Sequence, residues 1–147
     1  MITSDYLKRV LPELDEFKNK DMSEHVLDGN GYDGIMAILE NLRSSTFPTV
    51  IVEDRSSGSI TIDAGPVDVY SLPVWVMVAG ENGDEYPAFE SAFALVKKIL
   101  KLFVRDQDTA DLDGIDLSRI GYYKRFAPGC YGYEILLTFR MDIDLSL

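Results

Sequence analysis

The end of the chain alternates between apolar and polar residues over a longer stretch than most strands occupy. The apolar or aromatic positions that share one face are Tyr131, Tyr133, Ile135, Leu137, Phe139, Met141, Ile143 and Leu145. The residues between them are nearly all polar or small, so the period is two, as in a β-strand with one buried face. At about 3.3 Å per residue the stretch would span roughly 50 Å, against ~17–20 Å for an ordinary strand. We therefore expect either a bulge that bends this strand or a strand that reaches past its own domain.

The last apolar residues of this alternation, Met141, Ile143 and Leu145, predict an interaction surface. The charged residues between them oppose association with another chain on only one face of the strand. An exposed strand edge invites pairing with another chain, and an apolar face that extends beyond the fold is hard to leave in water. We expect residues 141–147 to lie against another subunit or a partner protein.

The segment from Pro87 to Arg105 predicts the longest helix of the chain. The apolar residues that recur along one side are Phe89, Phe93, Val96, Leu100 and Phe103, flanked by Ala92 and Ile99. The basic residues along the opposite side are Lys97, Lys98, Lys101 and Arg105. This pattern is typical of an amphipathic helix, so we expect the apolar side to pack on a sheet. We expect the basic side to face solvent, and phosphate binding by these residues is the less favoured alternative.

Between Phe47 and Ala79 the pattern changes to short strands. Residues 49–54 and 59–64 are β-rich runs separated by "RSSG", which predicts a hairpin. The second half of Val67–Ala79 is apolar on both faces, which predicts a strand in the middle of a covered sheet. Pro73 cannot donate to a ladder, so it predicts a bulge or a break in that strand. A strand "SRIGYYKRF" and a turn "APGC" then lead into the final alternation.

Residues 1–46 predict a helical N-terminal part. Apolar residues at helical spacing run from Leu7 to Phe17, and Pro12 would kink this helix or begin a second one. Glycines among polar residues predict a loop over Asp28–Gly34. Helical spacing then returns over residues 35–42.

Length and composition fit one globular domain: 147 residues, of which 46% are hydrophobic and 27% charged. We expect a single α+β domain over residues 1–147, with N-terminal helices over residues 1–46. Over residues 47–147 a mostly antiparallel β-sheet packs against the amphipathic helix. The net charge of −11 disfavours sequence-specific nucleic-acid binding, which depends on neutralising phosphates. The absence of a long apolar run or a signal-peptide pattern, and the single cysteine, predict a cytoplasmic protein without membrane contact.

The stretch "RDQDTADLDGID", from Arg105 to Asp116, is the densest group of carboxylates and suggests a cation site. A calcium-binding EF-hand loop needs glycine at its sixth position and a bidentate glutamate at its twelfth. With Gly114 at the sixth position, the twelfth is Ile120, which cannot coordinate a cation. The loop at Asp28 fails the same comparison. A weak, irregular cation site over Asp106–Asp116 remains open, but turns held by Asp111, Asp113 and Asp116 are favoured.

No arrangement of residues predicts catalysis. His25 is the single histidine and Cys130 the single cysteine, which excludes a zinc site and leaves few partners for a nucleophile. A pair of carboxylates for acid–base work remains open, although nothing singles one out. The aromatic residues that alternate along the strands favour core or cross-strand packing over a ligand platform; they are Tyr70, Trp75, Tyr122, Tyr123, Tyr131 and Tyr133. We expect no catalytic residue, no cofactor and no metal, and hence not an enzyme.

The order of the predicted elements resembles the tail terminator and tail completion proteins of long-tailed bacteriophages. The stretches that carry the resemblance are "FPTVIVED", "VDVYSLPVWVMVAG" with the helix "AFESAFALVKKILKLFV", and the late hairpin "GYYKRFAPGCYGYEILLTFRMDI". They cover most of the chain after Phe47. The early region around residues 18–34 has no counterpart in the resemblance.

The resemblance implies a structural virion or prophage protein that caps the tail tube and joins it to the head connector. It implies a homo-oligomeric ring, with tail-tube and head–tail connector proteins as partners. Such a protein would lie in the cytoplasm of the host cell during assembly and in the virion tail afterwards. The alternative is a small non-catalytic binding or adaptor module that uses a sheet edge. A small hydrolase with a carboxylate-bound metal is the least favoured reading.

Overall fold

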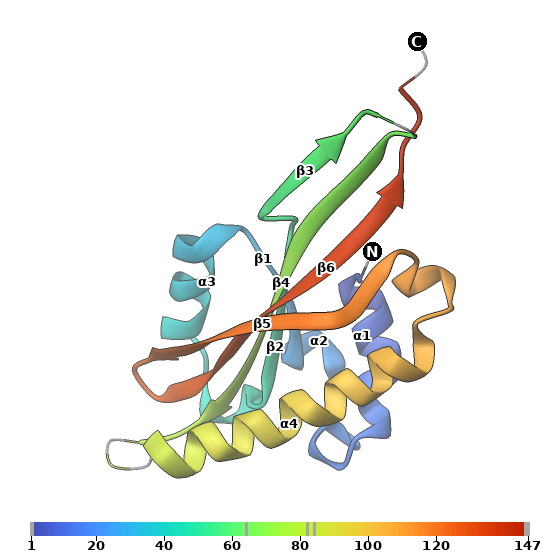
Figure 1. The fold of residues 1–147 in the computed structure, drawn as a ribbon. Coiled ribbons are helices and arrows are strands. Elements are labelled where there is room, and N and C mark those ends of the chain that lie inside the picture. Colours follow the sequence, from blue (N-terminus) through green and yellow to red (C-terminus); the bar gives the residue numbers. More distant parts are fainter. Residues whose placement is uncertain (1, 64, 82, 84, 146–147) are drawn as a thin grey trace.

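The computed structural model describes residues 2–63, 65–81, 83 and 85–145, and its centre is a six-stranded sheet (Figure 1). The strands are β1 (Val26–Gly29), β2 (Thr49–Glu53), β3 (Ser57–Thr61), β4 (Val67–Ala79), β5 (Ile115–Ala127) and β6 (Cys130–Asp142). Their order is β1-β2-β4-β6-β5, and β3 also pairs with β4. All neighbours run antiparallel except β1 and β2. With helices packed on this sheet, the predicted α+β fold is confirmed.

The longest ladder of the sheet joins β4 and β6, and we call this pair of strands the spine. They pair without interruption from Val67 opposite Asp142 to Ala79 opposite Cys130. The predicted alternation is confirmed, because the odd-numbered residues of β6 from Tyr133 to Phe139 all join the core beneath the long helix. No register shift interrupts the pairing of β6 with β4. β6 ends at Asp142, so residues 143–145 do not form the predicted continuation of the strand.

Two separate strands, β2 and β3, lie beside the same side of β4, so the predicted hairpin between them is wrong. β2 and β3 do not pair with each other, because both pair with the same side of β4. Val52 lies opposite Val74 and Ser57 opposite Ser71, so residues 53–56 face only the two positions between them. One of these positions is Pro73, which has no N–H to donate. The irregularity predicted at Pro73 therefore lies in the neighbouring edge, while β4 itself continues through the proline.

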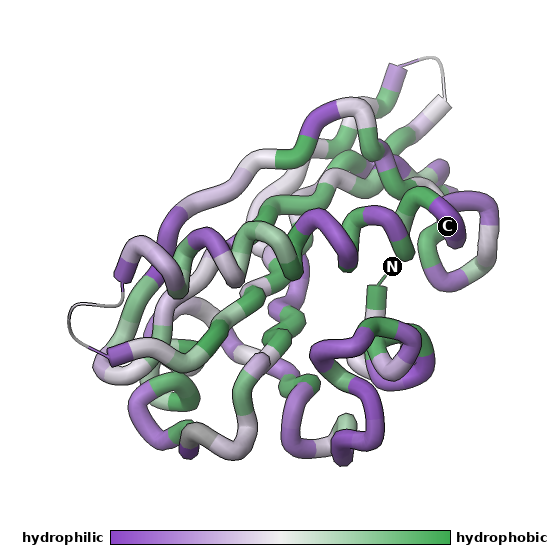
Figure 2. The backbone as a smooth tube through the Cα atoms, turned by 90° about the horizontal axis from the view of Figure 1, so that it is seen from below, coloured by the Kyte–Doolittle hydropathy of each residue, from purple (hydrophilic) through white to green (hydrophobic). Residues whose placement is uncertain are grey.

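Helices cover both faces of one half of the sheet. The long helix α4 (Glu85–Asp106) packs on β4 and β6, and α1 (Ser4–Val10) contacts β1 and shares the same core. The helix α3 (Gly31–Glu40) covers the opposite face. Hydrophobic and hydrophilic residues alternate along α4, as a helix with one buried side requires (Figure 2). Within the described residues, no helix is long and apolar enough to span a membrane.

The buried side of α4 differs slightly from the predicted one. Its fully covered residues are Ala88, Ala92, Leu95, Val96, Ile99, Leu102 and Phe103. Phe89, Phe93 and Leu100 are only half-buried at the rim of the interface. The ring of Phe89 contacts Tyr131 and Tyr133 of β6, and the ring of Phe93 contacts Tyr133 and also Tyr122 of β5.

The N-terminal part corrects three predictions. The apolar run from Leu7 to Phe17 is α1 followed by two 3-10 turns, η1 (Leu11–Glu13) and η2 (Asp15–Phe17), and Pro12 lies in the first of these turns. A short helix α2 (Met22–His25) leads into β1, so this part also contributes a strand. The predicted loop over Asp28–Gly34 is instead the end of β1 and the start of α3.

The β1–α3 connection depends on two glycines. A Cβ on Gly29 would lie 2.6 Å from the Cγ1 atom of Ile35 and 2.9 Å from the Cγ2 atom of Ile51. Gly31 has a φ of 73°, a conformation that glycine adopts without strain. These residues allow α3 to turn back directly over the sheet, and a further 3-10 turn η3 (Ser44–Thr46) then precedes β2.

Candidate interaction surfaces

The acidic loop between α4 and β5 fastens the helical layer together. Tyr6 Oη of α1 donates to Asp106 Oδ2 at 2.8 Å, and Arg105 also binds Asp106. Asp111 forms an ion pair with Arg9, which corrects the prediction that it would hold a turn. Asp116 makes the predicted side-chain-to-backbone hydrogen bond, because its Oδ1 accepts from the backbone N–H of Ser118 at 3.0 Å, but it does so at the irregular start of β5 and not in a turn.

The charges around this loop are matched rather than gathered for a cation. Arg105 holds the pKa of Asp106 below its ordinary value, and hydrogen bonds from Ser118 do the same for Asp116. The 3-10 turn η4 (Ala110–Leu112) buries Leu112 in the core. In the described ranges, no three His, Cys, Asp or Glu side chains come together in a way that could hold a metal ion.

The basic residues of α4 face solvent, as predicted, and two of them are paired. Lys98 Nζ lies 2.9 Å from Glu16 Oε1, and Arg105 Nη1 lies 2.7 Å from Glu13 Oε1. Both carboxylates belong to the 3-10 turns that follow α1. The basic side of α4 therefore helps to hold the N-terminal segment.

The two residues with reactive side chains are buried. His25 Nδ1 lies 2.8 Å from the carbonyl oxygen of Pro48, and its ring meets Phe17 edge-on. Cys130 begins β6 beneath α3, and burial raises the pKa of its thiol. These surroundings keep the thiol protonated and account for both residues as packing elements.

A cluster of charged and aromatic residues lies on the α3 side of the sheet. Arg125 Nε donates to Glu134 Oε1 at 2.9 Å, and Glu134 is buried. The guanidinium also lies over the rings of Tyr32, Trp75 and Tyr123. The protein's own arginine thus occupies this aromatic cage, which ties the β5–β6 hairpin to the start of α3.

Beside this cluster, Trp75 Nε1 donates to Glu53 Oε2 at 2.9 Å. Burial raises the pKa of Glu53, and the nearby charge of Glu134 acts in the same direction. A cleft of about 410 Å³ opens there. The sequence reasoning missed the cluster, because Glu134 is one of several charged residues on its face of β6, with Arg140 and Asp142.

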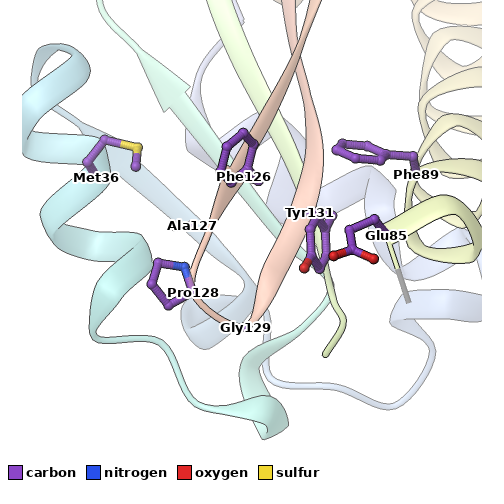
Figure 3. Close-up of a pocket in the computed structure, with 8 residues that line it drawn as sticks. All are labelled: Met36, Glu85, Phe89, Phe126, Ala127, Pro128, Gly129 and Tyr131. Atoms are coloured by element: carbon purple, nitrogen blue, oxygen red, sulfur yellow. The ribbon is translucent and has the colours of Figure 1, made fainter. Parts of the chain in front are cut away.

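An open apolar groove of about 770 Å³ lies where α3, α4 and the β5–β6 turn meet (Figure 3). Phe89 from α4 and Phe126 from β5 stand on either side of Tyr131, and Met36 approaches from α3. Among the described residues that line the groove, Glu85 is the one that carries a charge. An apolar surface of this kind is suited to an apolar side chain of another molecule.

The groove continues into the outer edge of β5, which we call the aromatic edge and define as Gly121–Ala127. Tyr122, Tyr123 and Phe126 are exposed there, Phe126 to 69%. Tyr70 and Tyr133 are buried as predicted. Tyr122 is exposed but makes the predicted cross-strand packing, with its ring centroid 5.7 Å from that of Tyr133, whereas Tyr123 is exposed and lies outside the core. Two adjacent aromatic residues point to opposite faces of a strand, which could have indicated an edge with aromatic residues on both sides.

The second exposed apolar surface lies at the far end of the spine. We call it the distal ribbon and define it as β3 with residues 67–71 of β4 and 138–142 of β6. The ribbon extends away from the helices, and the C-terminus leaves from its tip (Figure 1). Every residue of β3 is exposed, Ile60 to 59%, and Ile62 just beyond it to 67%.

The three predicted interface residues lie along this ribbon. Met141 is half-buried and packs against the core, where its sulfur lies close to Gly114. Ile143 follows the strand, and its N–H donates to the carbonyl oxygen of Pro66 at 3.1 Å. Leu145 exposes 48% of its surface. The tip of the ribbon therefore gathers Ile62, Ile143 and Leu145 at one end of the molecule.

Comparison with models of known protein families and with curated proteins finds no match for this chain.

Proposed function

We propose that this protein is a structural assembly subunit that joins copies of itself through its sheet. Its closest description is that of a phage tail terminator, which caps the tail tube and meets the head connector through a subunit ring. The distal ribbon is the observation that carries the proposal. A strand pair that continues past both helical layers, with isoleucine and leucine side chains in water, is stabilised when another protein covers it.

The remaining features favour a role in assembly over a catalytic role. The residues that could have formed a reactive site are occupied in holding the fold, as His25 and the acidic loop show. Strand edges and an apolar groove are the surfaces through which β-proteins recognise other chains. The acidic character of the chain suits a ring through which DNA slides without sticking.

The alternative function is an adaptor that binds one partner through a sheet edge. The aromatic edge and its groove favour this candidate, because they would suffice for one extended peptide. The two functions differ in their response to concentration. A ring subunit forms larger species on its own, whereas an adaptor remains a monomer or dimer until its partner is added.

The experiment compares the full chain with a variant that lacks residues 143–147. The deletion begins after Asp142 because Met141 and Asp142 belong to the packed ladder. Light scattering at rising concentration should show higher species for the full chain and a monomer for the shortened one, with the same melting temperature. Electron microscopy of the large species should show rings.

A matched control replaces Val104 by Asp, since this exposed valine of α4 lies outside the ribbon. This variant should assemble like the wild type, whereas Ile62→Asp should not. A full-length protein that stays monomeric even beside tail-tube and connector proteins would contradict the proposed function.

A further inference from the structure

Three strands lie at the edges of the sheet, β1, β3 and β5, and the last two lie on opposite sides of the spine. The aromatic edge belongs to β5, which is joined to β6 on its inner side. The other edge belongs to β3, which is joined to β4 on its inner side. Within the described residues, neither strand has a partner on its outer side. Each outer side therefore presents backbone donors and acceptors that another strand can use.

The regular parts of the two edges have similar lengths. A bulge between Asp116 and Gly121 interrupts the start of β5, which leaves Gly121–Ala127 as the regular part. The other edge offers Ser57–Thr61. A bulge is a common way to end the pairing of an edge, so the pairing surface of β5 is confined to its aromatic part.

The two edges carry opposite charges. Arg119 and Lys124 are exposed on β5, and in the part of the chain that the structure describes neither forms an ion pair. Asp54 and Asp63 flank β3, are exposed, and likewise form no ion pair with a described residue. In a chain of net charge −11, two such cations on one strand are a local exception.

The apolar residues of the two edges also complement each other. Tyr122, Tyr123 and Phe126 on one side offer broad rings and the groove beside Tyr131. Ile60 and Ile62 on the other side offer branched aliphatic chains. Pairs of aromatic and β-branched residues are favourable neighbours across strands.

We propose that the aromatic edge of one copy pairs with the β3 edge of a second copy, so that the sheet continues from subunit to subunit. This inference rests on the proposed self-assembly and identifies the surfaces that carry it. Pairing of two aromatic edges would bring together Lys124 of both copies, with Arg119 in the bulge beside each edge, and pairing of two β3 edges would bring together Asp54 and Asp63 of both copies. Repulsion between like charges therefore selects the head-to-tail contact, and a repeated head-to-tail contact closes into a ring or grows into a filament.

The test reverses the charge of each edge separately. One variant carries Arg119→Glu and Lys124→Glu, and the other carries Asp54→Lys and Asp63→Lys. Each variant alone presents two edges of the same sign, so its assembly should require a concentration more than about tenfold higher than the wild type. An equal mixture of the two variants has complementary edges and should assemble again. Circular dichroism and melting temperature verify that each variant is folded.

The control carries Lys97→Glu and Lys101→Glu, which make the same charge change on the exposed side of α4. It should assemble like the wild type. If it is impaired as strongly as the edge variants, net charge rather than edge pairing governs assembly and the inference is wrong.

The outcomes separate the edge pairing from the proposed function. If the wild type assembles and both edge variants assemble equally well, the pairing is wrong while the structural function stands. If the β5 variant alone loses assembly and the mixture does not recover it, the aromatic edge binds something other than β3, which also overturns the pairing. A wild type that remains monomeric at millimolar concentration and beside its partners contradicts both.

Discussion

The two ends of the β4–β6 spine use the same strands for different purposes. In the covered half, Val74, Val76 and Ile135 lie beneath α4 while Trp75 and Met77 lie beneath α3, and all are buried. In the distal ribbon, Tyr70 and Phe139 still join the core at its base, whereas every residue of β3 is exposed. The pairing between the strands is continuous through both halves, so the difference lies only in what covers them.

The ribbon keeps its shape through a few contacts at its base. Tyr70 stacks on Phe139 with ring centroids 5.5 Å apart, and the guanidinium of Arg55 lies 4.1 Å from the centroid of Tyr70. Arg55 also pairs with Asp68 at 2.7 Å. Beyond this stack the side chains of β3 meet water. An alternating pattern therefore specifies which face of a strand is apolar, whereas the length of the neighbouring helices determines how much of that face is covered.

The largest expected effect comes from emptying the core of the covered half. Phe103 is completely buried between α4 and the sheet. Phe103→Ala should lower the free energy of unfolding by about 3–5 kcal/mol, the range for truncating a buried aromatic residue. Ile60→Ala in the ribbon should change it by less than about 0.5 kcal/mol, as exposed substitutions do. Urea unfolding measures both, and equal losses would show that the ribbon is as much a part of the core as the covered half.

A smaller effect should come from adding one methyl group to the covered half of the spine at Gly132. A Cβ on Gly132 would collide with the carbonyl oxygen of Val76 and lie 2.9 Å from the Cα of Met77. Gly132→Ala should therefore cost about 1–3 kcal/mol through overpacking. The control is Gly121→Ala on the open edge, where the nearest neighbour is a Leu136 carbon at 3.8 Å. Thermal melting should separate the two variants, and similar melting temperatures would mean that the spine yields as easily as the edge.

The smallest expected effect concerns the ion pairs that hold the helical cover. The pKa of Asp106 is lowered by Arg105, so its contribution to stability is present above its ordinary pKa of 3.8 and is lost as the pH falls through the lower folded value. Asp106→Asn should flatten this acid-side loss and reduce the melting temperature at neutral pH. Melting curves between neutral and acidic pH measure the change. A variant that retains the full acid-side loss would show that other carboxylates account for it.

The parts of the fold that the sequence predicts best are those with a long, uninterrupted period. The alternation of β6 and the amphipathic pattern of α4 each extend far enough to indicate both the element and its buried face. The edge strands were harder because their partners are set by distant residues. Nothing near "RSSG" shows that β2 and β3 pair with β4 rather than with each other.

The candidate surfaces differ in the same way: the surface that extends a long periodic pattern could be predicted, and the surface on an edge strand could not. The exposure of Leu145 and the partial exposure of Ile143 agree with a pattern that continues beyond its domain, since the alternation was too long for a small sheet. The exposed Tyr122 and Tyr123 could not be told from core residues, because burial on an edge strand depends on whether another strand lies beside it. The Arg125–Glu134 pair was equally invisible, since its partners meet only when the hairpin folds onto α3.

Amide hydrogen exchange on dilute and on concentrated protein tests the role of the distal ribbon most directly. If the ribbon and the aromatic edge are assembly surfaces, the amides of β3 and Gly121–Ala127 should exchange more slowly in the concentrated, assembled sample. The amides of the covered half, which are already paired and buried, should exchange equally slowly in both samples. Exchange of β3 and the aromatic edge that is fast and identical at both concentrations, in a sample where light scattering shows assembly, would contradict this division of the molecule.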